Sequence, residues 1–108
     1  MKTTVKIYLR KHKSGKGVLV WRITRHRISR ELTSSFEVFP LEWDETGQKI
    51  VSKNSSAKRK KALSLIKSEL ELKKMVMLRV IEVFGAKDYT ARDVIDRFLW
   101  LQQRPILR

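Results

Sequence analysis

Cysteine is absent from this sequence, so neither a disulfide framework nor a thiolate metal site is available to stabilise the fold. No apolar run is long enough to span a bilayer, and no charged leader followed by an apolar stretch opens the chain. We therefore expect a soluble protein that is not exported and that works in a reducing compartment.

The residue sets that most enzymes require are also missing. The sequence contains no glycine-rich phosphate-binding loop, and no group of histidines or carboxylates has the spacing of a metal site. The only histidines, His12 and His26, lie in basic stretches beside expected turns, where a solvated or phosphate-facing side chain is the simpler interpretation. We predict no catalytic residue, no cofactor and no metal, and we do not expect an enzyme.

Acidic residues are missing from the first 30 positions, which hold ten of the 25 lysines and arginines. The rest of the chain holds the other 15 basic residues and all 11 acidic ones, so the two parts carry +10 and +4 of the formal charge of +14. A polyanion is the simplest partner, and its footprint falls mainly on the N-terminal third. A membrane surface is the weaker alternative, because the charge falls in segments with strand and loop patterns.

Alternation of apolar and polar residues predicts three antiparallel strands, at about residues 4 to 11, 18 to 25 and 28 to 39. In the second strand Leu19, Trp21 and Ile23 form an apolar face, while Arg22 and Thr24 lie on the opposite face. The third strand is expected to break or bulge at residues 33 to 35, where small polar residues interrupt the apolar positions. The apolar face of such a sheet needs a cover.

Helical periodicity replaces the strand pattern after residue 54. Ser55 or Ser56 is the expected N-cap of one long helix from Ala57 to Phe84, which contains no glycine or proline. Such a helix spans ~40 Å, so its second half, which is apolar nearly all round, should meet a further surface. The apolar positions expected along the helix are Ala62, Ile66, Leu70, Met77, Ile81 and Phe84.

A second, shorter helix is expected from Ala91 to Leu101, with Thr90 as its N-cap and Gly85 ending the first helix. Its expected apolar stripe is Val94, Ile95, Phe98 and Leu101. The predicted fold class is α+β, with a three-stranded antiparallel sheet packed against a long C-terminal helix and followed by the shorter helix. We divide the chain into a basic sheet region (1–53), a long helix that covers the sheet and extends beyond it (54–85), and a second helix with a linker (86–108). The abrupt, partly apolar end at residues 105 to 107 suggests a piece of a longer protein.

The basic hairpin of residues 18 to 39 is the candidate DNA-binding element. A β-ribbon fits the major groove, where arginine pairs with guanine and hydroxyl groups contact phosphates or bases. The alternative is an ordinary solvated sheet face. Glu31 either accepts a hydrogen bond from a cytosine amino group or neutralises a neighbouring arginine, and we favour the second. The candidate DNA contacts are Lys6, Tyr8, Arg10, Lys11, Lys13, Arg22, Thr24, Arg25, His26, Arg27, Ser29, Arg30 and Thr33.

Several short motifs occur in a characteristic order. They are Trp21-Arg22-Ile23-Thr24, a basic turn, Phe36-Glu37-Val38-Phe39-Pro40, Glu42-Trp43-Asp44 and the long helix. Together they resemble the N-terminal arm-type DNA-binding domain of tyrosine recombinases, in particular the integrases of phages, conjugative transposons and related mobile elements. The stretch from Tyr89 to Leu99 is similar to the segment that precedes the SAM-like core-binding domain in that family.

The resemblance implies a sheet that reads arm-type sites in DNA integration and recombination, in the bacterial cytoplasm, while other domains cut and rejoin the DNA. Arg22 and Thr24 match the Arg-Ile-Thr strand of the family. Ser35 departs from the pattern, because family members often have glycine there, and this puts the bend of the third strand in question. The catalytic arginines, histidines and tyrosine nucleophile of the family have no counterpart in this chain.

Our leading hypothesis is sequence-selective binding of double-stranded DNA. The alternative is a protein-interaction module that docks through the long helix and has only non-specific affinity for nucleic acid. A third possibility is a ribosomal-type RNA binder, which should prefer folded RNA to duplex DNA. Residues 75–84 and 94–101 are the expected surfaces for self-association or for contact with a missing core-binding domain.

Overall fold

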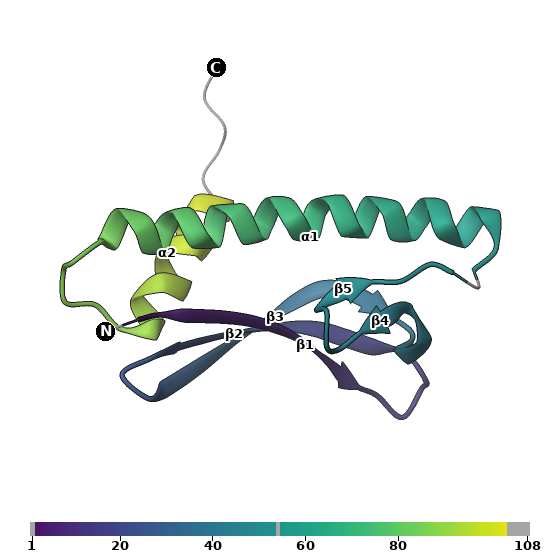
Figure 1. Ribbon diagram of the computed structural model, residues 1–108, viewed down its shortest axis with the longest axis horizontal. Helices are drawn as coiled ribbons and strands as arrows, with labels where there is room; N and C mark the ends of the chain where they lie inside the picture. The colour runs from purple at the N-terminus through teal and green to yellow at the C-terminus, as the bar shows by residue number, and fades with distance from the viewer. Residues whose placement is uncertain (1, 54, 104–108) are drawn as a thin grey trace, which may run out of the picture.

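The computed structural model describes residues 2–53 and 55–103 and has the predicted α+β class (Figure 1). A three-stranded sheet is formed by β1 (Thr4–Lys11), β2 (Gly17–Arg25) and β3 (Ile28–Val38). A short 3-10 helix, η1 (Pro40–Glu42), leads into a small hairpin of β4 (Trp43–Asp44) and β5 (Lys49–Ile50). The helices α1 (Ala57–Phe84) and α2 (Ala91–Gln103) complete the order of elements.

The central strand β2 pairs antiparallel with both neighbours, and residues directly opposite one another share a face. Arg22 stands between Lys6 and Glu31 on one face, and Trp21 stands between Ile7 and Leu32 on the other. This register confirms the predicted split of the hairpin into a polar and an apolar side.

The predicted irregularity of β3 is present. Val18 and Val20 are two residues apart in β2, but their partners Glu37 and Thr33 are four apart, so β3 carries two extra residues here. Ser34 stabilises this bulge, because its Oγ donates to the carbonyl of Leu19 at 2.6 Å and accepts from the N–H of Phe36 at 3.1 Å.

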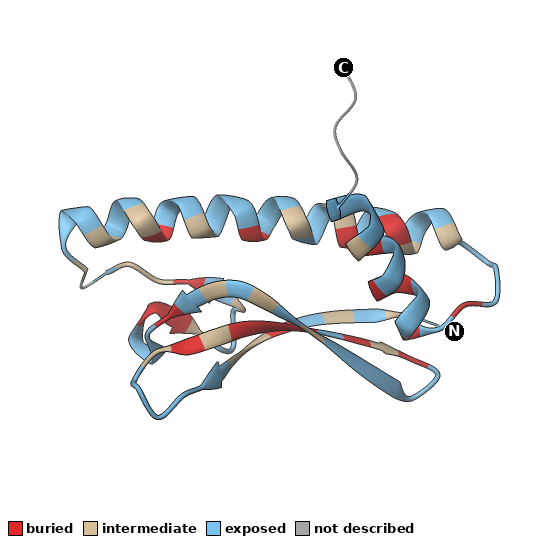
Figure 2. Cartoon of the chain, turned by 180° about the vertical axis from the view of Figure 1, so that it is seen from behind, coloured by how far each residue is buried: buried red, intermediate tan, exposed pale blue. Residues whose placement is uncertain are grey.

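Both helices lie on the apolar face of the sheet. Helix α1 runs alongside the sheet, and α2 folds back between the C-terminal half of α1 and the strands (Figure 1). Buried residues of both helices face the strands (Figure 2), and the rings of Trp21 and Phe98 are 6.5 Å apart. The largest fully buried side chains are those of Leu19, Val20, Trp21, Ile23, Val38, Leu63, Met77 and Val94.

The predicted ends of α1 and the predicted start of α2 are confirmed, and α2 extends to Gln103, two residues beyond the predicted Leu101. The hydroxyl of Ser56 accepts the N–H of Arg59 at 3.2 Å, which makes Ser56 the N-cap of α1. Gly85 ends α1 with a φ of +58°, in the region that glycine adopts most readily. Thr90 and Asp93 exchange side-chain and backbone hydrogen bonds at the start of α2, as a capping box requires.

The buried stripe of α1 differs from the predicted one. Leu70 and Met77 are buried as expected, but the other buried positions are Leu63 and Val80. The remaining predicted positions, Ala62, Ile66, Ile81 and Phe84, are only half-buried. Both α2 and β5 contact α1, and the side of the helix that they cover is not the side that periodicity alone predicts.

The second half of α1 was expected to meet a further surface, and α2 of the same chain supplies part of that surface by packing against it. Leu72, Met75, Leu78 and Val83 nevertheless stay exposed, and Leu101 is exposed although it was placed on the apolar stripe of α2. The end of the linker predicted for 86–108, residues 104–108, lies outside the described residues.

The small β4–β5 hairpin ties the end of the sheet to α1. Trp43 is buried there. Glu42 accepts two hydrogen bonds from Arg59 of α1, both at 2.7 Å, and a third from the N–H of Phe39 at 2.8 Å. Beside the hairpin, Gln48 Oε1 accepts the outward N–H of Ile7 in the edge strand β1 at 2.8 Å.

Candidate nucleic-acid interface

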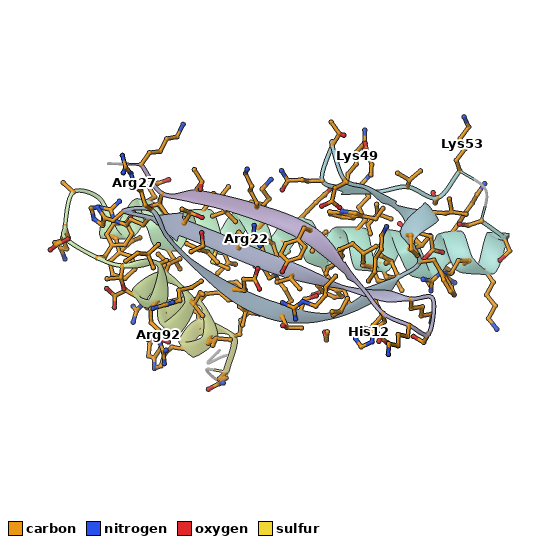
Figure 3. All side chains as sticks on the ribbon, turned by 90° about the horizontal axis from the view of Figure 1, so that it is seen from below. His12, Arg22, Arg27, Lys49, Lys53 and Arg92 are labelled. Carbon is orange, nitrogen blue, oxygen red and sulfur yellow. The ribbon has the colours of Figure 1, made fainter. Side chains whose placement is uncertain are left out.

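The face of the sheet opposite the helices is open (Figure 3). We call this surface the open face, and the strand register brings together seven of the thirteen candidate residues on it. They are Lys6, Tyr8 and Arg10 from β1, Arg22 and Thr24 from β2, and Ser29 and Thr33 from β3. Strand alternation brings them to one side because their positions are an even number of residues apart within each strand.

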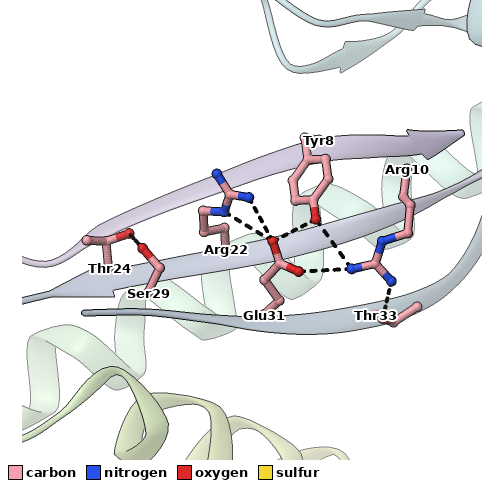
Figure 4. A network of polar contacts seen from close by, with 7 residues as sticks. All are labelled: Tyr8, Arg10, Arg22, Thr24, Ser29, Glu31 and Thr33. Carbon is pink, nitrogen blue, oxygen red and sulfur yellow. Dashed lines mark hydrogen bonds and ion pairs between the residues drawn. The ribbon is translucent and has the colours of Figure 1, made fainter. Parts of the chain in front are cut away.

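A single carboxylate connects three of these side chains (Figure 4). Oε2 of Glu31 accepts a hydrogen bond from the hydroxyl of Tyr8 at 2.6 Å, and it accepts two from Arg22, with Nη2 at 2.8 Å and Nε at 3.2 Å. Oε1 of Glu31 accepts from Nη2 of Arg10 at 2.9 Å. Both carboxylate oxygens are therefore engaged by strands β1 and β2.

Two further contacts fix the arginines of this network. The guanidinium of Arg22 lies over the ring of Tyr8, 4.9 Å from its centroid. Arg10 donates to the hydroxyls of Tyr8 and Thr33 at 3.3 and 3.4 Å. The side chains remain accessible, with Arg22 47%, Arg10 44% and Glu31 33% exposed.

The network sets the charges of its members. The hydrogen bond from Tyr8, followed by that from Arg22, holds the pKa of Glu31 below its usual value. The pKa of Arg22 is raised, mainly by its hydrogen bond to Glu31, and the pKa of Arg10 is raised, mainly by Tyr8. All three groups are charged at neutral pH, so Arg10, Arg22 and Glu31 sum to +1. The interpretation of Glu31 as a partner of neighbouring arginines is confirmed.

A pair of hydroxyl groups continues the open face toward the β2–β3 turn. Thr24 Oγ1 and Ser29 Oγ are 2.7 Å apart, and either can be the donor (Figure 4). A hydroxyl can donate and accept, so this pair can exchange its internal bond for one to an amino or a carbonyl group of a ligand.

Basic residues flank the open face at both ends (Figure 3). Lys11 and Lys13 are exposed at the end of β1 and in the loop that follows it. At the opposite end His26 and Arg27 form a two-residue turn with φ values of +53° and +64°. Nε2 of His26 lies 3.9 Å from Oδ1 of Asp88. The two loops can therefore contact phosphates on either side of a ligand that is bound to the strands.

Two candidate residues, Arg25 and Arg30, lie on the helix side of the sheet and not on the open face. Arg25 is buried on the helix side of the sheet, where Nε donates to the carbonyl of Tyr89 and Nη1 to the hydroxyl of Thr3, both at 2.9 Å. Its guanidinium also lies 3.8 Å from the centroid of the Tyr89 ring. Arg30 pairs with the buried Ile23, so it projects from the helix side of β3, although it is exposed.

Residues from the β4–β5 turn border the open face. Glu45 and Gln48 line a shallow pocket of about 360 Å³ together with Lys6, Ile7, Tyr8 and Arg22. The sequence offered no signal for this approach, because a polar turn with ordinary composition is placed beside β1 only by tertiary packing.

Within residues 2–53 and 55–103, no three histidine, aspartate or glutamate side chains gather closely enough to hold a metal ion. No helix in this part of the chain is long and apolar enough to cross a membrane. Comparisons with family models, with curated proteins and with solved structures found no match to this chain.

Proposed function

We propose that this chain binds double-stranded DNA in a sequence-selective manner, with the open face of the sheet in the major groove. The observation that carries the proposal is the one-sided cover of the sheet, which leaves an accessible polar array between two basic loops. A β-sheet of this width enters the major groove, where arginine and hydroxyl side chains can reach base edges.

The distribution of charge supports this reading. Lys11, Lys13 and Arg27 stand at the ends of the open face, where phosphate contacts would set affinity and orientation. Arg22 and Thr24 lie in the central strand β2, where contacts with base edges would set selectivity. Affinity should fall as salt rises, because each neutralised phosphate releases counterions.

The test is the double substitution Arg22→Ala with Thr24→Ala. It removes one guanidinium and one hydroxyl from the central strand of the open face, so we expect affinity for a selected duplex to fall by about 10- to 100-fold. Affinity for a random duplex should fall only a few-fold, since only one positive charge that can contact a phosphate is lost. The measurement is duplex binding by fluorescence anisotropy at fixed salt, after selection of the preferred sequence from a random pool.

A matched control is Ser64→Ala with Lys67→Ala, which removes one hydroxyl and one positive charge from exposed positions of α1. This variant should bind both duplexes almost as the parent does. Equal losses on both duplexes with the Arg22 and Thr24 variant, or a random pool that yields no preferred motif, would contradict sequence reading by the open face. A preference for a folded RNA pool would favour the RNA-binding alternative.

The resemblance to arm-type domains extends this proposal to a biological setting. In that setting the chain is the targeting module of a site-specific tyrosine recombinase of a bacterial mobile element, working in the cytoplasm. The catalytic steps would belong to other domains. The motif enriched from the random pool should then recur as repeats that flank a recombination core site.

A second candidate function is a protein-interaction module, and an exposed apolar groove favours it. The groove has a volume of about 880 Å³ and lies along the second half of α1, with Leu72, Met75, Leu78 and Val83 among its lining residues. Three basic residues, Arg79, Lys87 and Arg97, stand around it against one acid, Glu82. The fitting occupant is an amphipathic helix with acidic flanks, and the charge of +14 opposes a second copy of the chain.

Leu78→Ser with Val83→Ser tests this second function. A three-turn amphipathic peptide with a leucine stripe and glutamate flanks should bind the parent protein, and the variant should lose at least tenfold in affinity. The same peptide with lysine flanks should bind weakly. Titration calorimetry measures both, and sedimentation shows whether the chain instead associates with itself. Equal binding of either peptide to parent and variant would exclude the groove as the docking site.

A further inference from the structure

Glu31 is the only acidic member of the network on the open face, and its place there is unusual for a surface that is to meet a polyanion. A carboxylate between two arginines repels phosphate and lowers the charge available for non-specific binding. Its contacts nevertheless join all three strands of the sheet. Glu31 itself belongs to β3, and its side chain binds Tyr8 and Arg10 of β1 and Arg22 of β2.

We propose that Glu31 is a specificity-determining residue: it holds Arg22 and Arg10 in fixed orientations and offsets their charge, so that the open face favours base edges over phosphates. The inference rests on the proposed DNA-binding function. It assigns to Glu31 no role in folding and no direct contact with the nucleic acid.

The contacts of Arg22 fix the orientation of its guanidinium. Glu31 receives Nε and Nη2 from one edge of the guanidinium, and the Tyr8 ring lies 4.9 Å from its carbon. The described contacts of Arg22 do not include Nη1 (Figure 4). A guanidinium held in this way presents one edge to a ligand and has already lost rotamer freedom, so less entropy is lost on binding. Fixed orientation favours bidentate pairing with guanine, which depends on direction.

Glu31 also lowers the net positive charge of the cluster. A phosphate attracts any cation without regard to direction, so a flexible, unpaired arginine would bind the backbone of every sequence equally. The pairing with Glu31 reduces two cations to a net charge of +1 in this cluster. Uncharged base edges are not repelled by the carboxylate, so the reduction weakens phosphate contacts more than base contacts.

The ion pairs of Glu31 lie at the surface of the sheet. Ion pairs as exposed as these contribute little to the free energy of unfolding. Substitution of Glu31 should therefore leave the fold intact, and a change in DNA selectivity can be assigned to the open face itself.

The test compares Glu31→Gln with Glu37→Gln. By register Glu37 lies opposite Val18, on the same face as Arg22, and the contacts of the described residues do not include it in the network. Both changes remove one negative charge from the open face, but only the first alters the arrangement of Arg10 and Arg22. Thermal unfolding followed by circular dichroism checks that each variant folds as the parent does.

For both variants we expect tighter binding to a random duplex, by about threefold to tenfold, and a steeper dependence on salt. For Glu31→Gln alone, the ratio of affinities for the selected and random duplexes should fall by about tenfold, which is the size of one lost directional contact. NMR of the Nε–H groups gives an independent readout, since the Arg22 signal should broaden or shift only in the Glu31 variant.

Two outcomes overturn the inference in distinguishable ways. If the parent selects a motif but both variants keep the same affinity ratio, or lose it equally, Glu31 has no specific role and the proposed function survives. If the parent shows no preference among duplexes, the proposed function fails and the role of Glu31 in selectivity fails with it.

Discussion

Replacement of Trp21 by alanine is expected to lower the free energy of unfolding by about 3–5 kcal/mol. Trp21 is 1% exposed and is the largest fully buried side chain. It lies in the central strand and approaches Phe98 of α2, so its removal leaves a cavity where the sheet and the second helix meet. The loss is measured by unfolding in urea, followed by the backbone signal in far-ultraviolet circular dichroism, because the fluorescence of Trp21 is absent from the variant.

Trp21→Phe is the matched control, because it keeps an aromatic ring against Phe98 and loses less volume. It should cost less than half as much as the alanine variant. A loss below about 1 kcal/mol for Trp21→Ala would contradict a common core of sheet and α2, since such small losses are typical of surface positions.

The second large effect is expected at Glu42. Its side chain is 10% exposed and receives two hydrogen bonds from Arg59, whose side chain is 27% exposed, together with the N–H of Phe39. Glu42→Ala leaves this guanidinium and this N–H without their partner, so we expect a loss of about 2–3 kcal/mol, below the range for fully buried pairs. Because the pair joins η1 to α1, chemical unfolding of the whole domain should report it.

The same pair makes stability depend on pH. The hydrogen bond from Arg59, followed by that from Phe39, lowers the pKa of Glu42 in the folded state. Its stabilising contribution is therefore complete above the ordinary glutamate pKa and is lost as pH falls through the lowered one. Glu42→Gln removes this titration, so the stability of the variant should fall less steeply than that of the parent below about pH 4. Parallel curves for the two proteins would exclude the pair as a source of acid sensitivity.

The elements of the fold were predictable because the local signals in this chain agree with one another. Alternation over residues 5 to 10 and 19 to 24 marks two strands, and the bounds of α1 follow from a serine cap at one end and Gly85 at the other. The small polar residues near Ser34 also indicated the bulge of β3. Each of these signals acts within a few residues, so no tertiary information is needed to use it.

The errors arose where distant segments meet. Arg25 has the surroundings of a solvated tip residue in the sequence, but Tyr89, 64 positions later, supplies a ring and a carbonyl that draw it into the core. The burial of Leu63 and Val80 in α1 likewise depends on which other elements contact the helix, and these are β5 and α2. Periodicity describes one element at a time and carries no information about the side from which a second element approaches.

The open face was predictable in composition but not in arrangement. Strand parity alone places Lys6, Tyr8 and Arg10 on one side of β1. The convergence of Tyr8, Arg10 and Arg22 on one carboxylate depends on the register between strands, which is set by the turn at His26 and by the bulge. The sequence therefore predicted that Glu31 pairs with a neighbouring arginine, and the structure shows that its arginine partners are Arg10 and Arg22.

The hydrogen bond from Ile7 to Gln48 has a consequence for how copies of this protein behave when concentrated. An outer strand offers its unpaired N–H and carbonyl groups to any other extended chain, and such templating is a common start of fibril growth. The side chain of Gln48 occupies one of these donors near the middle of β1, and the same strand carries the charged side chains of Lys6, Arg10 and Lys11. This edge of the sheet is thereby discouraged from recruiting a further strand.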